Sequence, residues 1–173
     1  MGGLAVVAAI LFLAGALLLW ASHRLRQRSG LPQGRVIYND TGALRRVERP
    51  LFSRRYRLTG KPDYLLQDGD QIVPLEVKSG AAPPQPYPSH VLQLAAYCLL
   101  VTEHHGVRPA YGIIRYRDRS FAVDFTPQLE THLLDMLDSL RTDATKNDVP
   151  RSHHNPTQCA ACGYRPHCDQ SLV

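Results

Sequence analysis

The chain has 173 residues and a formal net charge of +5. This length allows one folded domain with a core of ordinary size and a smaller appendage. Internal repeats and low-complexity segments are absent from the sequence, so a repeat architecture is excluded. Ten arginines and only two acidic residues precede Lys61. This bias suits a phosphate-containing or anionic lipid partner, and it would serve solubility or membrane topology equally well.

An uncharged apolar segment runs from Leu4 to Ala21. As a helix it would be about 27 Å long, which just spans the hydrocarbon core of a bilayer. The arginines at positions 24, 26 and 28 follow this segment, whereas a cleaved signal peptide would carry its positive charge before it. We therefore predict a transmembrane anchor over residues 1–23 and a basic juxtamembrane linker over 24–34. The positive-inside rule predicts a single-pass membrane protein whose C-terminal domain is cytoplasmic.

The domain that follows is predicted to cover residues 35–150. A strand is expected near Gly34, and residues 44–57 are basic and partly extended. A β-hairpin is then predicted between Leu58 and Gly80, because two runs of strand-forming residues flank the turn Gln67-Asp68-Gly69-Asp70.

Charged residues gather on one face of this predicted hairpin. Glu76 and Lys78 share a strand face because side chains alternate, and Asp63 can lie opposite them. Two neighbouring carboxylates repel each other unless a cation binds between them. Asp63 and Glu76, with the carbonyl of Val77, are therefore predicted to hold Mg²⁺ or Mn²⁺ for phosphodiester hydrolysis. Lys78 would orient the water or stabilise the phosphorane. The alternative is a half-buried strand with a salt-bridged solvent face.

A helix is predicted after the hairpin, with Ser89 as its N-cap and His105 near its end. Gln93 and Tyr97 are four residues apart and so share one face, which can turn toward the hairpin. His90 could reach a phosphate from this helix, although a lone histidine is more often a capping or surface residue.

These motifs carry a family resemblance. Pro62-Asp63, Glu76-Val77-Lys78 and Gln93-x-x-x-Tyr97 resemble motifs of the PD-(D/E)XK nucleases of the RecB branch, and within it the CRISPR-associated RecB-like exonuclease family. The resemblance covers roughly residues 55–170. It implies a restriction-endonuclease-like α/β fold, a mixed sheet flanked by helices. It also implies that the acids bind Mn²⁺ or Mg²⁺, that the lysine assists hydrolysis, and that Gln93 and Tyr97 contact substrate or support the site.

The second half of the domain is simpler to interpret. A proline-rich loop over residues 81–88 is either a lid over the site or plain surface. Residues 110–116 and 121–125 are predicted to form a second hairpin. An amphipathic helix is expected from Pro127 to about Arg141. Its core stripe would consist of Leu129, Leu133, Leu134, Leu137 and Leu140.

A cysteine motif is predicted to form a separate knuckle over residues 151–173. Cys159, Cys162 and Cys168 have C-x2-C-x5-C spacing, which in a cytoplasmic domain indicates metal ligands rather than disulfides. The spacing resembles the cluster motif of the same exonuclease family, in which a fourth, upstream cysteine completes a [4Fe-4S] centre. Cys98 is expected to be a buried hydrophobe instead. The remaining ligand of an iron–sulfur or Cys3His zinc site could be His153, His154 or His167. A third alternative is an empty, vestigial knuckle.

Two functions are compatible with these residues. The first is a metal-dependent DNA nuclease, most simply an exonuclease, with DNA, the membrane and repair or defence proteins as partners. The second is a catalytically weak DNA-binding or scaffold module, because the histidine and cysteine that the family carries upstream of the hairpin are missing here. No histidine lies between His23 and His90, and Cys98 is the first cysteine. Retention of both acids and the lysine favours the enzyme.

Overall fold

A computed structural model of the chain describes residues 12–17, 34–37 and 43–173. The chain divides into two compact units, Met1–Asp135 and Met136–Val173. The division falls inside a long helix, whereas the domain boundary expected from the sequence lies near residue 150 and stays a prediction.

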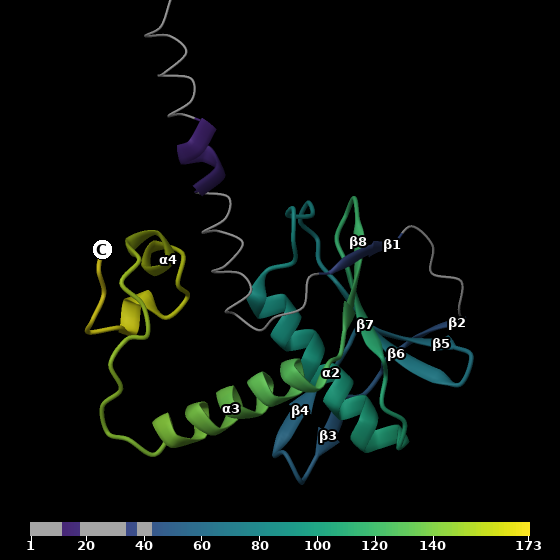
Figure 1. Cartoon of the computed structure of the whole chain (residues 1–173). Helices are drawn as coiled ribbons and strands as arrows, with labels where there is room; N and C mark the ends of the chain where they lie inside the picture. The colour runs from purple at the N-terminus through teal and green to yellow at the C-terminus, as the bar shows by residue number, and fades with distance from the viewer. Residues whose placement is uncertain (1–11, 18–33, 38–42) are drawn as a thin grey trace, which may run out of the picture. The chain divides into compact units, whose positions relative to one another are not determined.

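The first unit is built on a six-stranded mixed sheet, with strand order β1-β8-β7-β6-β5-β2 (Figure 1). Its strands are β1 (Arg35–Ile37), β2 (Ala43–Arg46), β5 (Tyr64–Asp68), β6 (Gln71–Val77), β7 (Tyr111–Arg115) and β8 (Ser120–Asp124). Both predicted hairpins are present, β5 with β6 and β7 with β8. The first turn contains Gly69 at φ 57°, a backbone conformation that glycine adopts at no steric cost.

One parallel pair makes the sheet mixed. β6 and β7 run parallel, with Glu76 opposite Ile114, and the helix α2 (Pro88–His105) makes the crossover between them. All other neighbouring strands in this sheet are antiparallel. The predicted fold class, a mixed sheet with helices packed on it as in restriction endonucleases, is therefore confirmed for this unit.

The structure divides the predicted first hairpin strand into two pieces. Leu58–Gly60 is β4 and pairs with β3 (Leu51–Ser53) in a separate two-stranded sheet. The main strand, β5, begins only at Tyr64, because Lys61 and Pro62 interrupt the extended run and proline cannot donate a ladder hydrogen bond. Asp63 consequently lies in the short connection that leads into β5.

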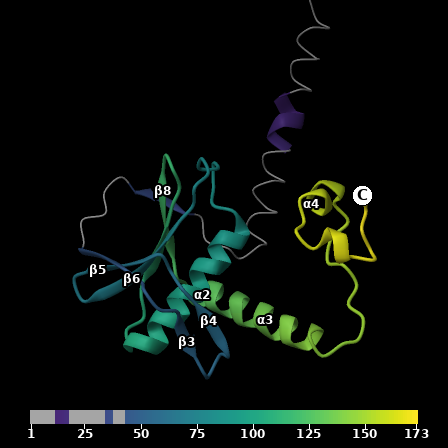
Figure 2. The ribbon, with the colours of Figure 1, turned by 180° about the vertical axis from the view of Figure 1, so that it is seen from behind.

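Helix α2 lies across the sheet, as both ribbon views show (Figures 1 and 2). Its N-cap is Tyr87 rather than the predicted Ser89, and no side chain caps it, since Pro88 already occupies the first turn. The helix ends at Gly106, which has φ 72°. A Cβ on Gly112 would lie 2.7 Å from Leu94 Cγ, so the absence of a side chain there allows α2 to approach β7 closely.

The opposite face of the sheet carries a second part of the core. Leu66, Val73, Leu75 and Ile113 form a buried cluster at 0–3% exposure. Because side chains alternate along β6, burying Val73 and Leu75 on this face turns Glu76 toward α2. The hydrophobic pattern thereby decides which face carries the charged residues.

Helix α3 (Pro127–Asp143) confirms the predicted start but only part of the predicted core stripe. Leu129 and Leu133 are buried, whereas Leu140 is 60% exposed. In the second unit, α4 (Pro156–Ala160) and a short 3-10 helix (Arg165–His167) follow. Asn155 caps α4 by accepting hydrogen bonds from the backbone N–H groups of Thr157 and Gln158.

The predicted membrane anchor requires a correction. Most of the segment from Leu4 to Ala21, and the linker over 24–34 except Gly34, lie outside the described residues. In the part of the chain that the structure describes, no helix is long and apolar enough to cross a membrane. This finding contradicts the predicted single-pass membrane location, and the membrane as a partner is not supported.

Candidate active site

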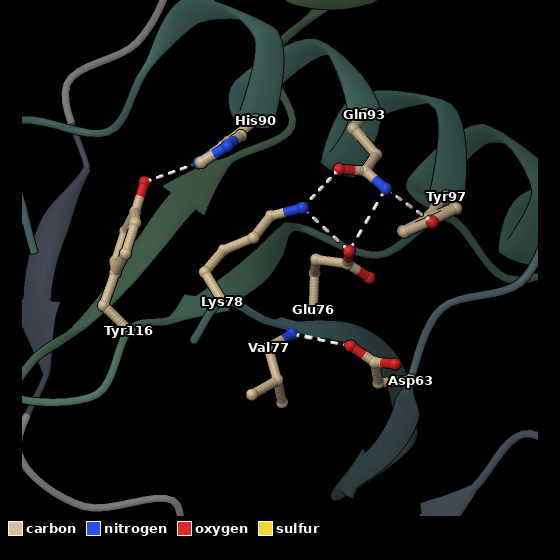
Figure 3. A network of polar contacts seen from close by, with 8 residues as sticks. All are labelled: Asp63, Glu76, Val77, Lys78, His90, Gln93, Tyr97 and Tyr116. Carbon is tan, nitrogen blue, oxygen red and sulfur yellow. Dashed lines mark hydrogen bonds and ion pairs between the residues drawn. The ribbon is translucent and has the colours of Figure 1, made fainter. Parts of the chain in front are cut away.

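The candidate site lies where the end of β6 meets α2 (Figure 3). Asp63, at the entry to β5, accepts a hydrogen bond from the backbone N–H of Val77 through Oδ2 at 2.8 Å. This contact joins residues 14 positions apart and holds the carboxylate against the end of β6. The antiparallel register of β5 and β6, with Tyr64 opposite Leu75, places Asp63 across from Glu76 as the sequence predicts.

Four of the predicted site residues form one hydrogen-bonded network (Figure 3). Lys78 Nζ lies 2.9 Å from Glu76 Oε1 and 2.7 Å from Gln93 Oε1. The Gln93 amide also donates to Glu76 Oε1 at 3.1 Å and to the Tyr97 hydroxyl at 2.9 Å. Helix α2 can supply both side chains because residues four apart project from the same face. The structure thus brings Gln93 and Tyr97 to the hairpin residues as expected.

Burial sets the electrostatics of this network. Glu76 is only 8% exposed, and desolvation raises the pKa of its carboxyl, with Lys78 acting in the opposite direction. The negative charge of Asp63 and a hydrogen bond between the two carboxyl groups raise the pKa of Glu76 further. Desolvation also raises the pKa of Tyr97. The two acids are therefore close enough to repel each other when both are ionised.

The donor set fits a divalent cation. Asp63 and Glu76 present two mutually repelling carboxyl groups, and the contacts drawn in Figure 3 use one oxygen of each. Hard carboxylate oxygens with room for water are the surroundings that Mg²⁺ and Mn²⁺ prefer. The carbonyl of Val77 stays a predicted ligand.

Two further side chains adjoin the network and were not predicted as a pair. His90 lies one turn before Gln93 on α2, and its Nδ1 lies 2.7 Å from the hydroxyl of Tyr116, the residue after β7. The available signal for Tyr116 was the alternation of residues 112 and 114 in β7, which continues to residue 116 just after the strand and puts all three on one face.

The three cysteines of the tail are not gathered into a metal site. Cys159 is buried within its own unit, where its sulfur accepts a hydrogen bond from the Leu172 backbone N–H at 3.3 Å, while Cys162 is exposed. This hydrogen bond, together with one from Ser171, lowers the pKa of the Cys159 thiol. Among the described residues, no group of three or more His, Cys, Asp or Glu side chains is placed to hold a metal ion. Cys98 is buried in α2, as predicted.

Fold and site together define a nuclease-like protein with two acids and a lysine at the end of a central strand. The sequence profile of the PD-(D/E)XK nuclease superfamily matches residues 8–169. The chain belongs to this superfamily, so the predicted class of protein, a nuclease of the hydrolase type, is confirmed. Members of the superfamily use divalent metals such as Mg²⁺ or Mn²⁺.

A curated relative agrees with the narrower resemblance. The chain is 24% identical over 132 residues to the CRISPR-associated exonuclease Cas4 of Francisella tularensis subsp. novicida. The match covers 76% of this chain and 66% of that protein, so the chain spans about two thirds of the relative's length.

Proposed function

We propose that this protein is a metal-dependent DNA nuclease that hydrolyses phosphodiester bonds as an exonuclease. The observation that carries the proposal is the convergence of Asp63, Glu76 and Lys78 on one side of the sheet, beneath Gln93 and Tyr97. A buried acid next to a second acid is unfavourable in an ordinary salt-bridged surface, which argues for a binding site.

Each residue has a distinct task in this proposal. Asp63 and Glu76 hold the cation, which when bound supplies a Lewis acid for the scissile phosphate. Lys78, held between Glu76 and Gln93, stabilises the negative charge that develops on the phosphoryl oxygens as water attacks phosphorus and the P–O bond breaks. Gln93 keeps the ammonium group in place, and Tyr97 keeps the Gln93 amide in place.

The choice of DNA and of exonuclease action rests on the similarity to the exonuclease relative and on the charge distribution. The β3–β4 turn carries three exposed arginines, Arg54, Arg55 and Arg57. Such a turn provides sequence-independent contacts to phosphates. Neither the structure nor the comparisons support a repair or defence protein as a partner.

The cysteine motif has a separate place in the proposal. Its C-x2-C-x5-C spacing supports an iron–sulfur cluster, or zinc as the alternative. The observed arrangement of Cys159, Cys162 and Cys168 does not fit such a group, since the three thiols are not assembled among the described residues. No step of the proposed hydrolysis therefore involves these cysteines.

The test is cleavage of internally labelled DNA by the full-length protein, with Mg²⁺ or Mn²⁺ and with a chelator as control. Linear and circular single strands of the same sequence are compared. We expect metal-dependent loss of the linear strand and survival of the circle. Cleavage of both forms would replace the exonuclease proposal with an endonuclease. Tight DNA binding without cleavage would favour the alternative of a catalytically weak DNA-binding module.

A further inference from the structure

A polar pair of side chains adjoins the site without belonging to the acid–lysine network. His90 projects from the same face of α2 as Gln93 and Tyr97, and Figure 3 shows it next to Lys78. Its Nδ1 lies 2.7 Å from the hydroxyl of Tyr116, which is only 4% exposed. A buried hydroxyl from the residue that follows β7 thus sets the orientation of a half-buried imidazole ring.

The hydrogen bonds around Tyr116 indicate which nitrogen of His90 carries the proton. Burial raises the pKa of the Tyr116 hydroxyl, and a hydrogen bond from the backbone of Tyr87 opposes this effect. The buried Tyr116 hydroxyl has one proton to donate, and among the described residues its side-chain partner is Nδ1 of His90 at 2.7 Å. Leaving that proton without an acceptor would cost free energy, so the hydroxyl donates and Nδ1 accepts.

A neutral imidazole that accepts at Nδ1 carries its proton on Nε2. Burial and the positive charge of Lys78 lower the pKa of His90, which keeps the ring neutral at neutral pH. Among the described residues, the hydrogen bond to His90 is made at Nδ1, and no partner is found for Nε2. The ring therefore presents a directed, uncharged N–H donor beside the lysine.

We propose that His90 is a substrate-binding residue whose Nε2–H donates to a non-bridging oxygen of one backbone phosphate of the nucleic acid, with Tyr116 as the positioning residue for the ring. This inference rests on the proposed nuclease function and names a second phosphate contact, next to the phosphate that faces Lys78. A neutral donor suits this place, because a second cation would repel Lys78.

The exposed ring of Tyr87 supports a nucleic-acid strand at this position. Tyr87 is 54% exposed at the start of α2, and its ring meets that of His90 edge to face with centroids 5.3 Å apart. An exposed aromatic ring beside phosphate donors is the usual arrangement for binding a single strand, in which bases stack while the backbone is held.

Methylphosphonate scanning of the DNA tests the contact directly. Each linkage of a short labelled single strand is replaced in turn by a neutral methylphosphonate, and the equilibrium affinity of the full-length protein is measured with Ca²⁺ in place of Mg²⁺. In the wild-type protein, a methylphosphonate at the linkage that contacts His90 should weaken binding about 10- to 100-fold. His90→Phe should bind unmodified DNA more weakly than the wild type by a similar factor. A methylphosphonate at that one linkage should then have no further effect on its affinity.

Three matched variants separate a phosphate contact from a structural role. His90→Gln retains a donor near the position of Nε2 and should recover part of the affinity and of the linkage-specific sensitivity. Tyr116→Phe frees the ring and should give an intermediate loss at the same linkage. His104→Phe replaces an exposed histidine in the last turn of α2 and should bind like the wild type.

The inference is overturned if His90→Phe binds with unchanged affinity, or if it loses affinity while keeping the wild-type sensitivity at every linkage. Cleavage of the unmodified strand by the wild-type protein with Mn²⁺ shows whether the proposed nuclease function itself holds. If the wild type cleaves DNA but His90→Phe changes neither affinity nor linkage sensitivity, only the inference about His90 is contradicted. A wild-type protein that neither binds nor cuts DNA contradicts the proposed function and the inference together.

Discussion

Lys78 Nζ lies 2.7 Å from Gln93 Oε1, which links the end of the hairpin to the crossover helix. The same ammonium group lies 2.9 Å from Glu76, with the Lys78 side chain only 21% exposed. The lysine is therefore fixed by one charged and one neutral acceptor on two different elements. A fixed ammonium can stabilise a developing charge with little reorganisation at the moment of reaction.

The first prediction concerns the two acids and the lysine. Asp63→Asn, Glu76→Gln and Lys78→Met should each lower the rate of DNA cleavage by at least about 100-fold, because each removes a charge that the reaction needs. Circular dichroism should show that the variants remain folded. Asp70→Asn, a change of an exposed acid in the β5–β6 turn, is the matched control. Wild-type rates in all three site variants would contradict the assignment.

Substitutions of the two site residues on α2 should lower the cleavage rate less than substitutions of the acids or the lysine. Gln93→Ala removes the neutral acceptor of Lys78 but leaves Glu76 in contact with it, so cleavage should fall about 10-fold, the effect of one hydrogen bond to a charged group. Tyr97→Phe removes only a partner of the Gln93 amide and should have a smaller effect still. Single-turnover rates would show the order. A larger loss in Tyr97→Phe than in Gln93→Ala would exclude the supporting role.

The raised pKa of Glu76 predicts a pH dependence of stability in the absence of metal. Because burial raises this pKa in the folded state, the folded protein binds the proton more tightly than the unfolded chain. The stability contributed by the protonated group is present below the unfolded pKa and is lost as the pH rises through the folded pKa. The difference in free energy of unfolding between wild type and Glu76→Gln should therefore decrease as the pH rises above about 4, the ordinary pKa range of a glutamate.

Urea denaturation with a chelator present measures this difference. Mn²⁺ should then stabilise the wild type at neutral pH and stabilise Glu76→Gln less, because ligand binding to the folded state shifts the unfolding equilibrium. A pH-independent difference would show that Glu76 is not desolvated in solution.

The close packing of α2 on the sheet predicts that adding a methyl group at position 112 will destabilise the protein. A Cβ at position 112 would lie within 2.9 Å of three Leu94 side-chain atoms, so Gly112→Ala must displace the helix or its leucine. The cost should be about 1–3 kcal/mol of stability, as for other overpacked cores. Cleavage should fall as well, because Gln93 is carried by the same helix. Gly80→Ala, where the added atom meets nothing within 4 Å, is the control.

Metal content decides between the alternatives for the tail. If the cysteines bind a cluster or zinc, anaerobically purified protein should contain stoichiometric iron or zinc, and Cys162→Ser should lose it. If they do not, local contacts such as that of Arg151 with Gln170 should keep the tail ordered after chelation. Protease resistance of the tail before and after chelation distinguishes the two cases. Loss of resistance together with loss of metal would establish the metal centre.

The sequence by itself predicted the two hairpins of the main sheet, the two long helices and the shared faces of the candidate site residues. Alternation along residues 71–78 fixes Glu76 and Lys78 on one face, and the spacing of Gln93 and Tyr97 fixes a shared helical face. These are local periodicities, so no knowledge of distant contacts is needed. The Asp-Gly turn defines the hairpin for the same reason.

Only the tertiary structure decided how these faces meet. The parallel pairing of β6 with β7 and the close approach at Gly112 place α2 over Glu76, and no local pattern contains that information. The pair of His90 and Tyr116 depends on the same docking, because the two residues lie on separate elements 26 positions apart. Apolar length alone wrongly predicted a membrane anchor, and cysteine spacing alone did not predict the positions of the thiols. Composition and spacing describe what a segment can form, whereas long-range packing decides what it does form.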